Sequence, residues 1–290
     1  MTLRDFRNRF TELLEAEGQE RGEVNSLFRL LGEAYLGMSP VEMSLHLNKE
    51  LSSEELKRME EGLERLQRHE PIQYILGETE FYGLPFRVNR NVLIPRPETE
   101  ELVEWILEDL KSAEIKEPRI LDIGTGSGCI AISLAKNLPG ARVSAVDVSE
   151  AALDTAKGNA VLNEVEVSFV KLDILTISEL PHSYDIIVSN PPYVRELERS
   201  EMKANVLENE PETALFVKDE NPLLFYNKIT KLAHTGLAKN GRLYFEINQY
   251  LGEETEQLLK QADLETELRK DFLGNFRMLR GIKRNEDREA

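Results

Sequence analysis

The sequence predicts an α/β fold, in which a doubly wound and mostly parallel sheet follows a small helical domain. Three observations predict it. Apolar residues recur at helical spacing within residues 1–75. From Arg119 onward, short apolar runs alternate with helical segments, which is the pattern of parallel strands joined by crossover helices. The last two strand-like runs, 264–268 and 278–282, have no helix between them and indicate a closing antiparallel pair.

The composition is that of a globular protein. The chain has 290 residues and is 41% apolar, which suffices for one large domain or two smaller ones with a buried core. It contains no run of about 18 apolar residues, so we expect no transmembrane helix. Residues 1–10 carry charges and no apolar stretch, so we expect no secretory signal. The single cysteine, Cys129, excludes an internal disulfide framework, and together these features indicate a cytoplasmic enzyme.

The chain is strongly acidic, with a formal net charge of −17 at pH 7. Non-specific attraction to nucleic acid depends on clustered Lys and Arg. The sequence has only scattered basic candidates, such as Arg4, Arg7, Arg280 and Lys283. We therefore expect no direct nucleic-acid partner. The net negative charge could keep the protein soluble, or it could steer a partner toward it.

The first part of the chain, residues 1–75, is expected to form a small helical domain. Ser39 before Pro40 is typical of a helix N-cap followed by a first-turn proline. Ser52 with Glu55 three residues later is typical of a capping box, and it opens a helix that we expect to end near Arg68. This part contains no catalytic constellation. The apolar face of its first helix comprises Leu3, Phe6, Phe10, Leu13 and Leu14.

The rest of the chain divides into a short linker and a large domain. Residues 76–98 have a β-like pattern and are expected to form a β-hairpin linker, with its turn at Gly83-Leu84-Pro85. Residues 99–290 are expected to form the large domain, which opens with a helix and contains the sheet. The seven strands expected there cover residues 120–123, 143–146, 165–172, 184–188, 243–247, 264–268 and 278–282.

A glycine-rich loop follows the first of these strands. It reads Gly124-Thr125-Gly126-Ser127-Gly128 and precedes a helical segment, which is the context that a ligand-binding glycine loop requires. Glycines allow a sharp turn and the close approach of a ligand, and the helix N-terminus presents amides to an anionic group. Because the glycine spacing is tighter than in the dinucleotide fingerprint, it argues against NAD. A purely structural turn is the alternative.

Acidic residues stand at the ends of the next two strands. Asp147 ends the second strand, where its carboxylate is placed to accept hydrogen bonds from both ribose hydroxyls of a nucleoside. Asp173 follows the third strand and is placed to contact an adenine amino group, and we group its neighbour Ile174 with it. Because an acid at a strand end is often only solvated, the assignment of Asp147 depends on the glycine loop.

The motif that indicates the chemistry follows the fourth strand and reads Asn190-Pro191-Pro192-Tyr193. Two prolines remove two backbone donors and stiffen the chain, so the carbonyl before each proline stays a free acceptor. The Asn190 side-chain oxygen and the Pro191 carbonyl are expected to receive the two hydrogens of one NH2 group. Tyr193 is expected to offer a flat face to a planar amide or base. A rigid loop without substrate is the alternative.

Together, these motifs resemble class I S-adenosylmethionine-dependent methyltransferases that act on planar nitrogens. The motif at 190–193 is shared by adenine-N6 DNA enzymes, some guanine-N2 RNA enzymes and protein glutamine enzymes. Three upstream segments discriminate among them: Pro-Ile-Gln-Tyr-Ile-Leu-Gly at 71–77, Phe-Tyr-Gly at 81–83, and Val-Leu-Ile-Pro-Arg-Pro-Glu-Thr-Glu at 92–100. This run is similar to the signature of the HemK/PrmC family, the release factor glutamine methyltransferases. The likeness covers nearly the whole chain, with departures near Pro211 and at Asn248.

The resemblance implies a function. S-adenosylmethionine would donate its methyl group, leaving S-adenosylhomocysteine, to N5 of the glutamine in the Gly-Gly-Gln motif of class I peptide chain release factors. The helices of 1–75 would dock the release factor, and 99–290 would be the catalytic domain. No metal and no membrane partner are implied.

The resemblance also implies a set of site residues. Arg96 and Glu98 would orient the Gly-Gly-Gln loop, or equally brace the helix that follows them. The catalytic and substrate-binding residues would be Asn190, Pro191, Pro192 and Tyr193. The cofactor would contact Gly124, Thr125, Gly126, Ser127, Gly128, Asp147, Asp173, Ile174 and Asn190.

Two alternatives stand beside this interpretation. The chain could be a nucleic-acid amine methyltransferase acting on adenine N6 or guanine N2, against which the net charge of −17 argues. It could also be a non-catalytic scaffold that binds the cofactor or the release factor. The intact motif at 190–193 argues against a scaffold, because a scaffold needs no paired acceptors.

Overall fold

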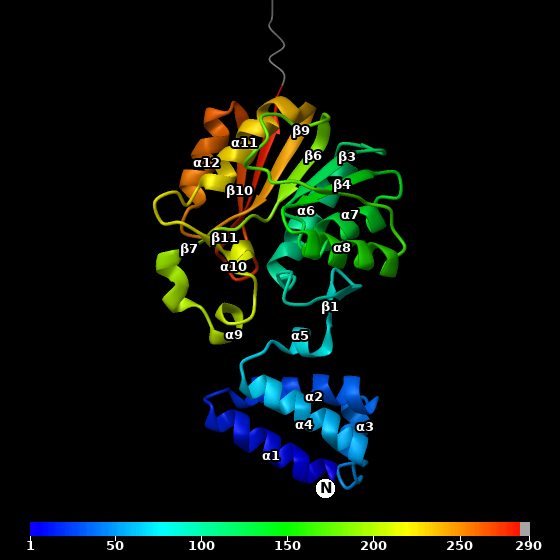
Figure 1. The fold of residues 1–290 in the computed structure, drawn as a ribbon. Helices are drawn as coiled ribbons and strands as arrows, with labels where there is room; N and C mark the ends of the chain where they lie inside the picture. Colours follow the sequence, from blue (N-terminus) through cyan, green and yellow to red (C-terminus); the bar gives the residue numbers. More distant parts are fainter. Residues whose placement is uncertain (285–290) are drawn as a thin grey trace, which may run out of the picture. The chain divides into compact units, whose positions relative to one another are not determined.

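The chain forms two compact units in a computed structural model that describes residues 1–284. The first unit comprises Met1–Gly77 and the short segment Lys203–Asn209. The second comprises Glu78–Met202 and the chain from Glu210 onward. Figure 1 traces the elements of both units, which are described separately below.

The first unit is helical, as its apolar spacing predicts. Ser39 and Ser52 cap their helices, and in each case the hydroxyl accepts the N3 amide in a complete capping box. A buried apolar cluster that includes Phe6, Phe10 and Phe28 holds the helices together. The helices are α1 (Leu3–Ala16), α2 (Arg21–Leu36), α3 (Pro40–Leu45), α4 (Ser53–Gln67), α5 (Ile72–Leu76) and α9 (Ala204–Leu207).

The hairpin that we expected as a linker groups with the second unit. It consists of β1 (Glu78–Phe81) and β2 (Leu84–Arg87). The turn expected at 83–85 is wrong by one residue, because the loop residues are Tyr82 and Gly83. Their φ angles are 52° and 71°, both left-handed, as a two-residue hairpin turn requires. Pro85 lies in β2 and has no backbone N–H to donate. Both strands of a two-stranded sheet are edge strands, and an edge strand tolerates proline.

The second unit is built on a seven-stranded sheet with the order β10-β11-β9-β6-β3-β4-β5. Strands β5, β4, β3, β6 and β9 run parallel to one another, while β11 runs antiparallel to β9 and β10. This confirms the predicted parallel sheet with a closing antiparallel pair. The strands are β3 (Arg119–Ile123), β4 (Arg142–Asp147), β5 (Ser168–Lys171), β6 (Tyr184–Ser189), β9 (Leu237–Glu246), β10 (Leu264–Lys270) and β11 (Phe276–Lys283).

Two strands begin at least three residues away from the predicted position. The third strand was expected from Val165 but begins at Ser168. The amide of Val165 donates instead to the Ala160 carbonyl at 3.1 Å, which closes the end of the preceding helix, so it cannot join the ladder. The strand expected from Leu243 begins earlier, at Leu237.

Helices cover both faces of the sheet (Figure 1). Adjacent residues of one strand enter different clusters: Ile120 packs in the cluster beneath α6 and α7, and Leu121 in the cluster beneath α11. Such strands are apolar on both faces, as parallel strands usually are. The helices are α6 (Pro97–Ser112), α7 (Cys129–Asn137), α8 (Glu150–Leu162), α11 (Leu224–Gly236) and α12 (Gly252–Gln261).

Short elements cross the carboxyl edge of the sheet. Two two-residue strands, β7 (Val194–Arg195) and β8 (Phe216–Val217), pair in parallel. The 3-10 helix η1 (Glu196–Glu201) follows β7, and the short helix α10 (Glu212–Leu215) precedes β8. The register sets Ile123 beside both Val146 and Ser189, so the loops after β3, β4 and β6 leave the sheet at one edge. Within residues 1–284, no helix is both long enough and apolar enough to cross a membrane.

Candidate functional site

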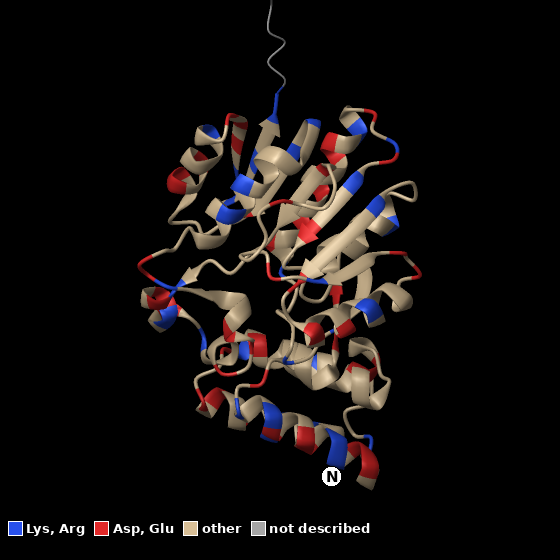
Figure 2. Cartoon of the chain, turned by 45° about the horizontal axis from the view of Figure 1, so that its top comes forward, with Lys and Arg blue, Asp and Glu red and all other residues tan. Residues whose placement is uncertain are grey.

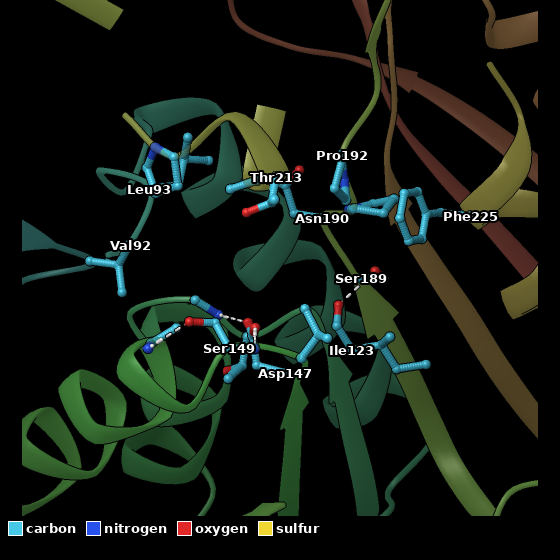
Figure 3. A pocket seen from close by; sticks show the side chains of 18 of the residues that line it. Val92, Leu93, Ile123, Asp147, Ser149, Ser189, Asn190, Pro192, Thr213 and Phe225 are labelled. Carbon is cyan, nitrogen blue, oxygen red and sulfur yellow. Dashed lines mark hydrogen bonds between the residues drawn. The ribbon is translucent and has the colours of Figure 1, made fainter. Parts of the chain in front are cut away.

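A cavity of about 840 Å³ opens at this carboxyl edge. Its volume lies within the range of about 300–1,000 Å³ that is usual for small-molecule sites. The loops after β3, β4, β5 and β6 line it, together with residues from the segments 90–96 and 211–229. Figure 3 shows Asp147 and Ser149 on one side of the space, with Asn190 and Pro192 across from them.

The glycine loop contributes backbone to the cavity. Gly124 and Gly126 have φ angles of 75° and 55°, which favour glycine, and a Cβ at either would meet no atom within 4 Å. Both residues line the cavity together with Thr125 and Ser127. The amides of Gly124 and Thr125 donate to the Val146 carbonyl at 2.9 and 3.1 Å, which ties the loop to the end of β4. The backbone here is therefore both held and open to a ligand.

Gly128 differs from the other two glycines, because it is not among the residues that line the cavity. It is the N-cap of α7 with a φ of 83°. A Cβ there would lie 2.8 Å from Cδ1 of Ile132 and 3.1 Å from Cβ of Ala156. Gly128 thus allows α7 to pack closely on α8, and the structure gives it this packing position rather than the expected contact with a ligand.

Gly128→Ala is expected to lower the free energy of unfolding by about 2–5 kcal/mol, from left-handed strain and overpacking together. Gly124→Ala is the matched control, because it has a similar φ but open space around its Cβ. It should lose only about 1–2 kcal/mol. Denaturant titration of both variants measures the difference, and equal losses would contradict the packing role.

Asp147 is held in place by the backbone around it. Its Oδ2 accepts from the amide of Gly126 at 2.9 Å, and its Oδ1 accepts from the amide of Ser149 at 2.9 Å. Figure 3 shows the carboxylate at the rim of the space. A carboxylate oxygen accepts more than one hydrogen bond, so Asp147 keeps acceptor capacity toward the cavity.

The residues that follow β5 also line the cavity. Asp173 and Ile174 both line it. Oδ1 of Asp173 accepts from the amide of Leu175 at 2.9 Å, which holds the loop in a tight turn. Ile174 is buried, with 7% of its surface exposed, and offers an apolar wall.

The loop after β6 places its acceptors on the far side of the cavity. The hydroxyl of Ser189 donates to the Ile123 carbonyl at 2.7 Å and fixes the start of the loop. Asn190, Pro191 and Pro192 line the cavity. In the part of the chain that the structure describes, the side-chain oxygen of Asn190 receives no hydrogen bond from the protein. The structure thus brings the glycine loop, Asp147 and Asn190 around one space.

Tyr193 points elsewhere than expected. It is not among the lining residues, and its ring packs against the apolar cluster beneath α11. Its hydroxyl donates to Oε1 of Glu246 at 2.9 Å. Burial, together with the adjacent Glu246 carboxylate, raises the pKa of Tyr193 well above its ordinary value, so it stays a donor. Its position supports the loop from within rather than offering a flat face to the cavity.

Two further residues of the site, Thr99 and Glu246, were not expected from sequence. Each has only 2% of its surface exposed. Oγ1 of Thr99 donates to Oε2 of Glu246 at 2.5 Å, and the amide nitrogen of Asn190 donates to Oγ1 of Thr99 at 3.4 Å. Burial raises the pKa of Glu246, while hydrogen bonds from Thr99 and Tyr193 oppose that rise. The sequence pointed to this pair in one way only: Thr99 lies within the segment 92–100, on which the family resemblance partly rests.

Arg96 and Glu98 occupy different positions. Arg96 lines the cavity, and its Nη2 lies 2.5 Å from Oε1 of the buried Glu210. The other oxygen of Glu210 accepts from the amide of Ile94 at 3.2 Å, so this ion pair fastens the 90–96 segment to the chain near Pro211. Glu98 is not among the lining residues and lies in the first turn of α6, where an acidic side chain stabilises a helix.

The chain matches two family models, which together cover much of its length. One is described as the PrmC N-terminal domain and matches residues 5–77. The other is described as the Methyltransferase small domain and matches residues 101–217. Among solved structures, the catalytic domain of hMettl16 in complex with MAT2A 3′UTR hairpin 6 has a TM-score of 0.57 at 19% identity, over 76% of this chain and 84% of that one. That likeness shows the fold alone.

Curated relatives match almost from end to end. The release factor glutamine methyltransferase of Flavobacterium psychrophilum is 54% identical over 282 residues, which is 97% of this chain and 99% of that protein. The enzyme of the same name from Bacteroides thetaiotaomicron is 46% identical over 259 residues, which is 89% of this chain and 92% of that protein. These matches confirm the resemblance seen in the sequence. The chain belongs to the family of release factor glutamine methyltransferases.

Proposed function

We propose that this protein methylates N5 of the glutamine in the Gly-Gly-Gln motif of class I peptide chain release factors, with S-adenosylmethionine as donor. The observation that carries the proposal is the cavity at the carboxyl edge. Its lining includes the glycine loop and Asp147 as well as the acceptors of Asn190 and Pro191. A nucleoside-type donor and a planar amide would therefore meet in one space.

The residues of the cavity fit S-adenosylmethionine. The open space at Gly124 and Gly126 lets a ligand approach the backbone, and Asp147 retains acceptor capacity for ribose hydroxyls. Asp173 and Ile174 would contact the adenine. When bound, S-adenosylmethionine supplies a methyl group that its positively charged sulfonium makes electrophilic.

The loop at 190–193 would prepare the amide nitrogen. Such a nitrogen is a poor nucleophile, because its lone pair is delocalised into the carbonyl. Oδ1 of Asn190 and the Pro191 carbonyl would accept its two hydrogens, fix its rotation and raise its electron density. Orientation of this kind supplies on the order of 7–11 kcal/mol in favourable intramolecular cases. The buried wall of Ile94 and Ile174 would help to exclude water from the amide.

The charge pattern favours a protein substrate over nucleic acid. The net charge is −17. Figure 2 shows Lys and Arg interspersed with Asp and Glu along the helices. A nucleic-acid amine methyltransferase would need clustered basic residues to hold phosphates.

The single cysteine and a substrate from translation support a cytoplasmic site of action.

Mass spectrometry of a release factor incubated with the enzyme and S-adenosylmethionine tests the proposal. We expect one added methyl group, located on the glutamine of the Gly-Gly-Gln motif. A release factor with that glutamine replaced by alanine should gain none. Methylation of DNA or ribosomal RNA from labelled cofactor, with none on the release factor, would favour the alternative activity instead.

We also propose that the first unit binds the folded release factor. This unit corresponds to the docking domain expected at residues 1–75. It contains helices and a core but no catalytic constellation. A chain that lacks residues 1–77 is expected to bind S-adenosylmethionine with little change. Its kcat/KM on folded release factor should fall at least about tenfold, which is the equivalent of 1.4 kcal/mol of lost contacts. Parent-like kcat/KM on the folded factor would rule out the docking role.

A further inference from the structure

A chain of buried hydrogen bonds lies behind Asn190 and joins three distant parts of the sequence. Thr99 stands in the first turn of α6, Glu246 is the last residue of β9, and Asn190 follows β6. Nδ2 of Asn190 donates to Oγ1 of Thr99 at 3.4 Å, and Oγ1 of Thr99 donates to Oε2 of Glu246 at 2.5 Å. The direction of these bonds determines which end of the Asn190 amide faces the cavity.

The Thr99 hydroxyl can donate only one hydrogen bond. A hydroxyl has one hydrogen to donate, and Oε2 of Glu246 accepts that of Thr99. Because Thr99 donates its hydrogen to Glu246, its oxygen can only accept from Asn190. The NH2 end of Asn190 must therefore face Thr99, and its oxygen must face away. An asparagine amide has nearly the same shape when flipped, so its surroundings decide its orientation.

The carboxylate of Glu246 is itself held at both of its oxygens. Its Oε1 accepts from the hydroxyl of Tyr193 at 2.9 Å, and its Oε2 accepts from the hydroxyl of Thr99 at 2.5 Å. The side chain of Asn248 donates to the Tyr193 carbonyl at 3.0 Å. A buried polar network with each member bonded is held rigidly, so the carboxylate keeps its Oε2 toward Thr99.

We infer that Thr99 and Glu246 are positioning residues that keep the Asn190 side-chain oxygen turned toward the substrate amide. The inference rests on the proposed role of Asn190 as an acceptor for the glutamine NH2 group. With the Asn190 amide flipped, its own NH2 would face the NH2 of the substrate, and two donors cannot bond. The flipped form is then bound but unproductive, so the loss of Thr99 lowers turnover rather than affinity.

Thr99→Val tests this step, because valine has the shape of threonine without the hydroxyl. We expect kcat for release factor methylation to fall about tenfold, the worth of one orienting hydrogen bond. The KM for the release factor and the affinity for S-adenosylmethionine should stay near those of the parent. Thr99→Ser restores the hydroxyl and should recover most of kcat. If Thr99→Val does not fold, Thr99→Ala replaces it, since the space it leaves admits a water to Glu246.

Tyr226→Phe is the matched control for a merely structural effect. It removes another buried hydroxyl near Glu246, but that hydroxyl bonds only to backbone atoms: it donates to the Glu246 carbonyl and accepts from the Asn248 amide. It should lose stability and keep the parent kcat. Parent kcat in Thr99→Val, or a kcat in Thr99→Ser as low as in Thr99→Val, would overturn the inference. Failure of the parent enzyme to methylate the release factor would instead overturn the proposed function, so the two failures are distinguishable.

Discussion

Replacing Asn190 with alanine is expected to lower the single-turnover rate of release factor methylation by about 10²–10³-fold, the usual effect of losing one preorganised polar group. Alanine removes one of the two acceptors proposed for the substrate amide, so the amide can rotate out of line with the methyl group. Because Asn190 stands across the cavity from Asp147, cofactor affinity should change much less (Figure 3). Single-turnover methylation, measured beside calorimetry of cofactor binding, separates the two effects.

Asn190→Asp is the finer variant of the same experiment. Aspartate keeps an acceptor at similar size but adds a negative charge near the sulfonium and near the buried Glu246. It should retain the cofactor while misplacing the amide. A near-parent rate in Asn190→Ala would remove the paired-acceptor mechanism, and with it the strongest chemical argument for an amide substrate.

Asp147→Ala is expected to weaken S-adenosylmethionine binding by roughly 1.5–3 kcal/mol, the worth of a hydrogen bond to a charged group. This corresponds to about 10–150-fold in Kd. Two losses contribute, because Asp147 would bind the ribose and also accepts the amides of Gly126 and Ser149. Removing it therefore also loosens the glycine loop.

Calorimetry of the Asp147→Ala protein measures this change in Kd. Asp154→Ala is the control, because Asp154 is an exposed acid on α8 whose side chain pairs with Lys157. It should bind the cofactor as the parent does. Unchanged affinity in a folded Asp147→Ala protein would place the ribose elsewhere.

Much of the site could be predicted from the sequence, because its main motifs are local and stand at strand ends. A short apolar run followed by glycines, by Asp147 or by Asn190 is visible along the chain. Parallel strands all end at the same edge, so the topology alone brings such residues together. The parallel sheet with its closing antiparallel pair was predicted on the same basis and is confirmed by the strand order.

Contacts across long sequence distances were decided only by the tertiary structure. Thr99 and Glu246 meet because the first turn of α6 packs against the end of β9, which lies beside β6. No periodicity in either segment encodes that contact. The inward turn of Tyr193 has the same origin, since its partner is again Glu246. Gly128 belongs to the motif by spacing, yet the approach of Ala156 from α8 gives it a packing role. The sequence by itself thus determined which chemical groups stand at the edge of the sheet. Packing between elements decided which of them face the cavity and which hold the others in place, because side-chain direction depends on neighbours that are remote in the chain.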